Sequence, residues 1–192
     1  MKNSTDSKEK ILEAASRLFQ VKGYNATGLN EILKESNAPK GSLYYYFPNG
    51  KEELALEAIK LASSTIRNRL KNTLNSNSDP KKAVECLIDN IIEDLKEDGR
   101  PKDISISLIA LETYLTSETL REACKEAFSA LDAMYSQKLI KSGIKEGIAK
   151  ELGIFIQVMI EGAITVSVTQ KNPEALLSVK KQIGILLSLY LK

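Results

Sequence analysis

The chain of 192 residues contains no histidine, no tryptophan and only two cysteines. The lack of histidine excludes Ser-His-Asp and Cys-His catalytic triads and every histidine-ligated metal site. Cys86 and Cys124 are too few for a disulfide framework, and their spacing is not that of a CxxC motif. We therefore expect two reduced thiols packed in the core, and we predict neither a metal nor a cofactor.

Long uninterrupted apolar runs are also missing. The most apolar stretch, residues 152–168, contains Gln157 and Glu161, whereas a membrane-spanning helix needs about 20 largely uncharged residues. The first ten residues are polar and lack the apolar segment of a secretory signal. The sequence therefore predicts a cytoplasmic protein with no membrane partner, in which residues 152–168 form a buried helix.

Charge is nearly balanced, at 27 basic against 25 acidic residues, but it is unevenly distributed. Residues 1–51 carry eight basic and five acidic side chains, a net charge of +3, and the rest of the chain carries −1. A mildly basic segment on a neutral body is compatible with contact to nucleic acid. The difference in net charge between the two segments is small, and it supports DNA binding only in combination with a DNA-binding motif.

Apolar residues recur at helical spacing along almost the whole chain, which predicts an all-α fold of about nine helices. Asp6 with Glu9 fits a capping box, Gly23 fits a helix end, and Thr27 fits the N-cap of a short helix that ends near Ser36. The helices expected after it cover residues 39–47, 51–75, 80–97, 104–115, 117–142, 151–171 and 173–191.

The turns between these helices contain residues with known turn preferences. Asn37 tolerates the left-handed turn that precedes the third helix, and Asp79-Pro80 reads as an N-cap followed by proline in the first turn. We expect loops at residues 98–101 and 143–150. Residues 104–108 alternate like a strand, but 104–115 also follow helical spacing, and no second strand is available for pairing.

Three short helices within the first 47 residues are typical of a helix-turn-helix DNA-binding head. In its third helix, Leu43 and Phe47 lie four residues apart and can anchor one face in the core. Consecutive tyrosines at 44–46 then leave aromatic and hydroxyl groups on other faces, where they can contact thymine methyls, sugars and phosphates. A purely structural role for this tyrosine run is the alternative.

The head resembles the TetR family of bacterial transcriptional regulators. The positions that carry the resemblance are Ile11, Leu12, Ala15, Leu18, Phe19, Gly23, Tyr24, Thr27 and Ile32, then the runs at residues 41–47 and 51–54. Pro48-Asn49-Gly50-Lys51 and the segment at residues 160–163 are similar to the LmrA/YxaF-like branch, which is tied to multidrug resistance.

This resemblance implies a DNA-binding domain at residues 1–50 and an effector-binding and dimerisation domain at 51–192. It implies a homodimer on a palindromic operator, with Thr27 and Lys51 on phosphates. The residues implied to face the major groove are Lys40, Gly41, Ser42 and Tyr44, with Tyr45 and Tyr46 on the DNA backbone. The turn departs from the family pattern of Gly, a β-branched residue and Ser, because it reads Asn37-Ala38-Pro39. Pro39 has no N–H, so a backbone contact is lost and the operator sequence cannot be carried over.

An effector pocket is expected among the middle helices, with an apolar lining and a few polar groups. Its candidate residues are Asn90, Tyr114, Phe128, Met134 and Phe155, although residues of these types at such positions are more often plain core than ligand contacts. Gln157, Glu161 and Thr165 form one polar ridge on an apolar helix, and Glu161 could face a cavity or the dimer interface. The expected interface residues, which must be shared with the protomer core, are Phe155, Ile156, Met159, Ile160, Gly162, Ala163, Leu176, Leu177, Ile183, Leu186 and Leu187.

The sequence thus predicts a DNA-binding repressor of a drug-resistance or efflux-type gene, released from its operator by an apolar or aromatic small molecule. One alternative is a DNA-binding dimer without an effector, which a body lacking a cavity would favour. An enzyme is a weaker alternative, because no phosphate loop, dinucleotide fingerprint or paired catalytic constellation is present.

Overall fold

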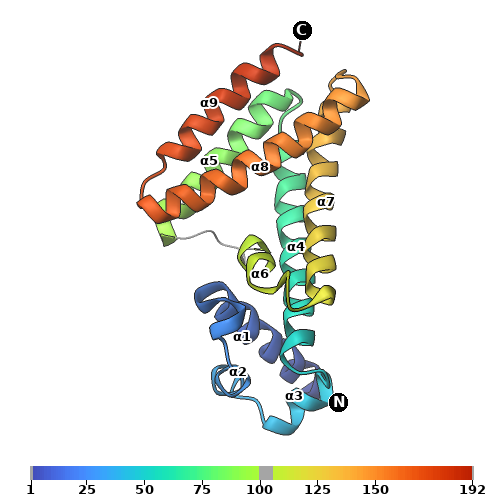
Figure 1. Cartoon of the computed structure of the whole chain (residues 1–192), viewed down its shortest axis with the longest axis vertical. Helices are drawn as coiled ribbons and strands as arrows, with labels where there is room; N and C mark the ends of the chain where they lie inside the picture. Colours follow the sequence, from blue (N-terminus) through green and yellow to red (C-terminus); the bar gives the residue numbers. More distant parts are fainter. Residues whose placement is uncertain (1, 100–105, 192) are drawn as a thin grey trace. The chain divides into compact units, whose positions relative to one another are not determined.

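The computed structural model describes residues 2–99 and 106–191, with side chains from residue 7 onward. Nine α-helices and no strand occur in the part of the chain that it describes (Figure 1). The helices are α1 (Lys2–Ala26), α2 (Leu29–Ser36), α3 (Lys40–Tyr46), α4 (Lys51–Asn75), α5 (Pro80–Asp98), α6 (Ile106–Thr113), α7 (Glu118–Lys141), α8 (Glu146–Gln170) and α9 (Glu174–Ser188). The predicted all-α fold is confirmed.

The chain divides into two compact units, and both α4 and α7 contribute to each. The first unit holds residues 1–65 and 103–127, so that α6 belongs with α1 to α3. The second holds residues 66–102 and 128–192. These two units are defined by how compactly their residues pack. The predicted boundary at residue 50 is defined by function, because it separates a DNA-binding domain from an effector-binding and dimerisation domain, and it stays a prediction.

In the first unit, α1 packs against α2, α3 and α6. Its apolar stripe, Ile11, Ala15 and Phe19, is fully buried, as the helical spacing in the sequence predicts. Cys124 is buried in the same unit, and burial raises the pKa of its thiol to about 11. Cys86, on α5 in the second unit, is exposed, so the prediction of a core position for it is wrong.

In the second unit, α9 packs against α5 and α8 around one continuous apolar core (Figure 1). Two ion pairs tie helices together at its edge: Arg69 on α4 reaches the buried Asp94 on α5 at 2.5 Å, and Lys180 on α9 reaches Asp89 at 2.6 Å. By length and mean hydropathy alone, α8 could cross a membrane. The core helix of a protein can have the same length and hydropathy, and Leu152, Ile156 and Ile160 of α8 are buried. We therefore interpret α8 as a core helix.

Most of the local turn signals are confirmed. Asn37 takes the left-handed conformation with φ 51°, and the Asp79 carboxylate caps α5 by accepting the Lys81 N–H at 2.9 Å. The ambiguous stretch is helical over the described residues Ile106–Thr113; residues 100–105, which include the start of that stretch and part of the expected loop at 98–101, lie outside the described part of the chain.

Three helix starts differ from the predictions. The first helix begins at Lys2, four residues before the expected cap at Asp6, and its regular geometry is broken at Gly23. The N-cap of α2 is Gly28 and not Thr27. The expected loop at 143–150 is shorter, since α8 already begins at Glu146, where an ion pair to Lys150 at 2.7 Å supports its first turn.

Gly153 lets α8 pack directly against α7. A Cβ at this position would lie 2.8 Å from the backbone oxygen of Asp132, which cannot move independently of α7. We expect Gly153→Ala to lower the free energy of unfolding by about 2–3 kcal/mol, as overpacked cores do. Gly147→Ala is the matched control, because no atom lies within 4 Å of its added Cβ; it should be neutral or slightly stabilising. Urea unfolding at one protein concentration measures both, and equal stabilities of the two variants would contradict this account.

Candidate DNA-binding surface

The segment from α2 to α3 forms a helix-turn-helix. The left-handed Asn37 ends α2, and the Ala38 N–H donates to the Leu33 carbonyl at 3.3 Å. Pro39 then sits in an extended conformation as the N-cap of α3, and its carbonyl accepts the Ser42 N–H at 2.9 Å. Three residues, 37–39, therefore connect the two helices. Pro39 lies one position before α3, whereas the sequence predicts it as the first residue of this helix.

Helix α3 is held in the core by one face and is open on the others. Leu43 and Phe47 are 0% and 1% exposed, as their spacing predicts. Tyr44 and Tyr45 are 48% and 78% exposed, which is unusual for large aromatic side chains. Lys40 and Gly41 are exposed, and Ser42 and Tyr46 are half-buried. The four residues predicted to read the major groove are thus accessible on one short helix; their contact with DNA stays a prediction.

Tyr46 has a role besides the predicted contact with the DNA backbone. Its ring meets that of Tyr45 edge-on, with 4.8 Å between ring centres. Such edge-to-face pairs are favourable and restrict both rings. The tyrosine run therefore divides: Tyr45 and Tyr46 pack against each other, whereas Tyr44 is exposed and takes no part in that ring pair.

Thr27 is buried and not on the surface. It is 1% exposed, and its hydroxyl donates to the Gly23 carbonyl at 2.7 Å. Because the hydroxyl is used in this way, Thr27 does not cap α2, whose N-cap Gly28 makes no side-chain bond. This leaves first-turn N–H groups of α2 without a side-chain cap, which is where a phosphate is most easily accommodated.

Lys51 begins α4 and is held by two neighbours. Its ammonium lies 4.4 Å from the centre of the Tyr24 ring and donates to the Asn25 carbonyl at 3.3 Å. Burial lowers the pKa of Lys51, and the negative charge of Glu112 opposes that shift. The side chain is half-buried, so part of it remains open to a phosphate.

Part of the basic charge counted in the head is neutralised within it. Arg17 pairs with Glu35 at 3.0 Å, and Lys22 pairs with Glu31. Lys40 stays exposed at the start of α3. Arg17 and Lys22 are thus less available for electrostatic attraction to DNA than the exposed Lys40.

The five residues predicted to line an effector pocket are not gathered together. Tyr114 belongs to the first compact unit and is exposed, while the other four belong to the second. Asn90, Phe128 and Met134 are half-buried, and Phe155 is 40% exposed. None of the five lines either of two cavities found in the second unit.

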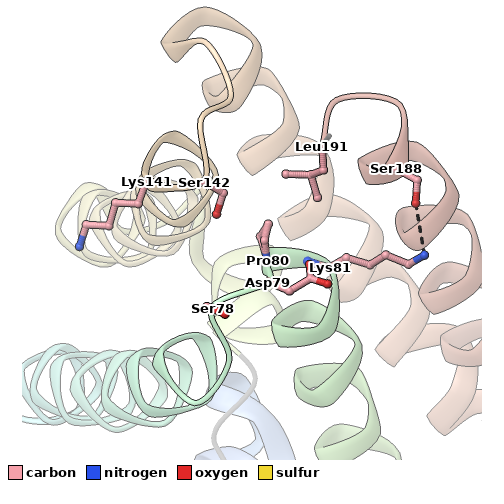
Figure 2. A pocket seen from close by; sticks show the side chains of 8 residues that line it. All are labelled: Ser78, Asp79, Pro80, Lys81, Lys141, Ser142, Ser188 and Leu191. Atoms are coloured by element: carbon pink, nitrogen blue, oxygen red, sulfur yellow. Dashed lines mark hydrogen bonds between the residues drawn. The ribbon is translucent and has the colours of Figure 1, made fainter.

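The first cavity, of about 550 Å³, is polar and lies where α5 begins and α7 and α9 end. Figure 2 shows the Lys81 ammonium reaching the Ser188 hydroxyl and the Lys141 side chain pointing away. Since Asp79 already caps α5, this end of the helix is not an open anion site.

The second cavity, of about 410 Å³, lies between the ends of α5 and α8 and the start of α9. Its apolar wall is formed by Ile92, Leu95, Val168 and Pro173. Ser167 also lines it, and the Ser167 hydroxyl is buried with no hydrogen-bond partner among the described residues. A buried hydroxyl without a hydrogen-bond partner destabilises the folded protein. The second cavity is therefore the better candidate for a ligand site. The sequence carried no signal for it beyond the apolar α8.

The structure separates the eleven residues expected at the dimer interface into two groups. Six of them are buried in the core of the protomer: Ile156, Ile160, Ala163, Leu176, Ile183 and Leu187. The dimer interface itself stays a prediction. The other five, Phe155, Met159, Gly162, Leu177 and Leu186, are exposed or half-buried. Gln157 is also buried, and its carboxamide donates to Glu161 at 3.2 Å, so the polar ridge is partly paired within α8.

A helix-turn-helix whose second helix exposes lysine, serine and tyrosine side chains, carried on an all-helical chain, defines a DNA-binding protein of the transcriptional-regulator class. Two family models match: bacterial regulatory proteins of the tetR family over residues 11–58, and the C-terminal domain of LmrA/YxaF-like transcriptional regulators over residues 80–182. The chain belongs to the TetR family and, within it, to the LmrA/YxaF-like branch.

Similar proteins agree with this assignment. The chain is 44% identical over 186 residues to the uncharacterized HTH-type transcriptional regulator YxaF of Bacillus subtilis, covering 97% of each chain. It is 43% identical over 182 residues to the HTH-type transcriptional regulator LmrA of the same organism, covering 95% of this chain and 97% of LmrA. The reduced form of NemR from E. coli has the same fold, with a TM-score of 0.83 at 21% identity over 93% of this chain and 95% of that one.

Family membership identifies the chain as a DNA-binding transcriptional regulator and not an enzyme. Regulators of this family bind operator DNA and are dimers.

Proposed function

We propose that the protein is a cytoplasmic repressor that binds a palindromic operator as a dimer through α3 and is released by a small molecule. The observation that carries the DNA contact is the outward face of α3, where Tyr44 and Lys40 are exposed while Leu43 and Phe47 hold the helix in place. Tyrosine, lysine and serine there can reach base edges and phosphates together.

The dimer would form through an apolar face that α8 and α9 leave exposed. On α8 the residues follow one another every fourth position, and this dimer face consists of Ile154, Val158, Gly162 and Val166 with Leu177 and Ile185 of α9. In the dimer, α8 and α9 of both copies would form a four-helix interface. This interface would cover an exposed apolar surface of a kind that is unusual on a monomer. Gly162 has no atom within 4 Å of an added Cβ in the protomer, which leaves room for close approach of a partner helix.

The effector would occupy the cavity lined by Ser167. The polar residues that line it carry hydrogen-bond donors: Ser167 a hydroxyl, Lys96 and Lys171 ammonium groups, and Asn172 an amide whose oxygen already accepts the Glu174 N–H at 3.1 Å. Donors above apolar walls suit an apolar body that carries a negatively charged acceptor group. Release from DNA then requires that such a ligand bind the DNA-incompetent arrangement more tightly.

We expect 1-anilinonaphthalene-8-sulfonate, an aromatic sulfonate, to bind the wild-type dimer and to lower its operator affinity. Ser167→Leu should fill the cavity and remove both effects while leaving operator binding without the probe unchanged. Fluorescence titration and gel shifts at fixed salt measure them. Unchanged probe binding in Ser167→Leu would contradict this cavity as the site, and no effect of any bound aromatic anion on operator affinity would favour the regulator without an effector.

A further inference from the structure

Helix α1 is interrupted at Gly23, where φ is 82° and ψ is 171°. Only glycine adopts this conformation readily. The break removes the following N–H groups from the regular pattern of the helix, so Tyr24 and Asn25 need acceptors elsewhere.

Glu112 on α6 supplies that acceptor from 88 residues away. Its Oε2 accepts the Tyr24 N–H, and it accepts the Asn25 N–H at 3.3 Å. The Asn25 side-chain amide donates in return to the Glu112 backbone carbonyl at 3.5 Å. A Cβ on residue 23 would lie 2.6 Å from Glu112 Oε1, so the approach also depends on glycine there.

The same two residues hold Lys51 from the other side. Tyr24 offers its ring and Asn25 its backbone carbonyl to the Lys51 ammonium. An unbroken series of contacts thus runs from the Glu112 carboxylate through Tyr24 and Asn25 to the Lys51 ammonium.

We infer that Glu112 is a positioning residue for DNA binding, which fixes the break in α1 and thereby places the Lys51 ammonium where it meets a phosphate. This rests on the proposed DNA contact of Lys51. Glu112 acts through Tyr24 and Asn25, because its carboxylate accepts hydrogen bonds from the backbone of α1.

The test compares Glu112→Ala, Lys51→Ala and the double variant in gel shifts over a range of salt concentrations. Lys51→Ala should weaken operator binding five- to tenfold and reduce the salt slope by about one per protomer, the signature of one lost phosphate contact. Glu112→Ala should reproduce both changes, and the double variant should lose little more than either single variant. Glu112→Gln should restore most of the affinity, because its amide oxygen can accept the same N–H groups.

Glu118→Ala is the matched control, since Glu118 is an acidic residue of the same unit that pairs with Arg121 at 2.6 Å and not with α1. If Lys51→Ala has no effect, the proposed phosphate contact fails. If Lys51→Ala weakens binding while Glu112→Ala keeps the wild-type salt slope, or if the two losses add fully, the positioning role is overturned. Should Glu112→Ala not fold by circular dichroism, Glu112→Asp replaces it; its shorter side chain should give the same reduced slope, and a wild-type slope would contradict the role.

Discussion

Val158→Asp is expected to convert the dimer to monomers and to weaken operator binding more than a hundredfold. Val158 is 61% exposed in the middle of the dimer face on α8. In a two-fold symmetric interface one substitution introduces two carboxylates, which would be buried without partners among apolar side chains. A monomer holds one half-site only and loses the gain from binding both at once. Analytical ultracentrifugation gives the assembly state, and gel shifts give the affinity.

The matched control for this prediction is Ile140→Asp on α7, which adds the same charge to an exposed apolar residue of the same unit outside the dimer face. It should leave the dimer and the operator affinity unchanged. A Val158→Asp protein that sediments as a dimer with wild-type affinity would show that the two copies meet elsewhere.

Tyr44→Ala is expected to weaken specific operator binding by about 10- to 100-fold, the range typical of losing one good base contact. Tyr44 is 48% exposed on α3 and its neighbour Leu43 is buried, so truncation removes contact surface without opening the core. Binding to unrelated DNA should change little, because the charged groups that dominate nonspecific binding remain. Gel shifts at one salt concentration with both kinds of DNA measure the difference.

Tyr114→Ala controls for the loss of an exposed tyrosine, since Tyr114 is 52% exposed in the turn that follows α6 and lies outside the helix-turn-helix. It should keep the wild-type affinity in the absence of effector. An equal loss for specific and unrelated DNA in Tyr44→Ala would mean that Tyr44 contributes to folding or to backbone contact and not to readout.

Features that depend on a few neighbouring residues could be predicted from the sequence. Asn37 and Asp79-Pro80 have conformational preferences that act within three or four residues, and the spacing of Leu43 and Phe47 fixes which face of α3 is buried. Thr27 shows the limit of such reasoning. Threonine is among the residues favoured at N-caps, but the break at Gly23 places a carbonyl within reach of Thr27, and its hydroxyl donates there.

Features that depend on contacts between distant segments could not be predicted. Helix α8 is apolar on nearly all sides, so the sequence could not divide Ile156, which is core, from Val158, which is exposed. No residue near Glu112 in the sequence indicates its role, because its partners Tyr24 and Asn25 lie 88 and 87 residues earlier in the chain. The Ser167 cavity arises where the ends of α5 and α8 meet the start of α9, and no local pattern encodes that meeting.

In the proposed mechanism, two copies of α3 read the two halves of one palindromic site. Selecting binding sequences from random DNA and footprinting the best of them with hydroxyl radicals tests it directly. We predict sites with two-fold symmetry and two equal protected regions whose centres lie about 34–36 Å apart, one turn of the double helix. Sites without symmetry, or a single protected region occupied by one protomer, would contradict the claim.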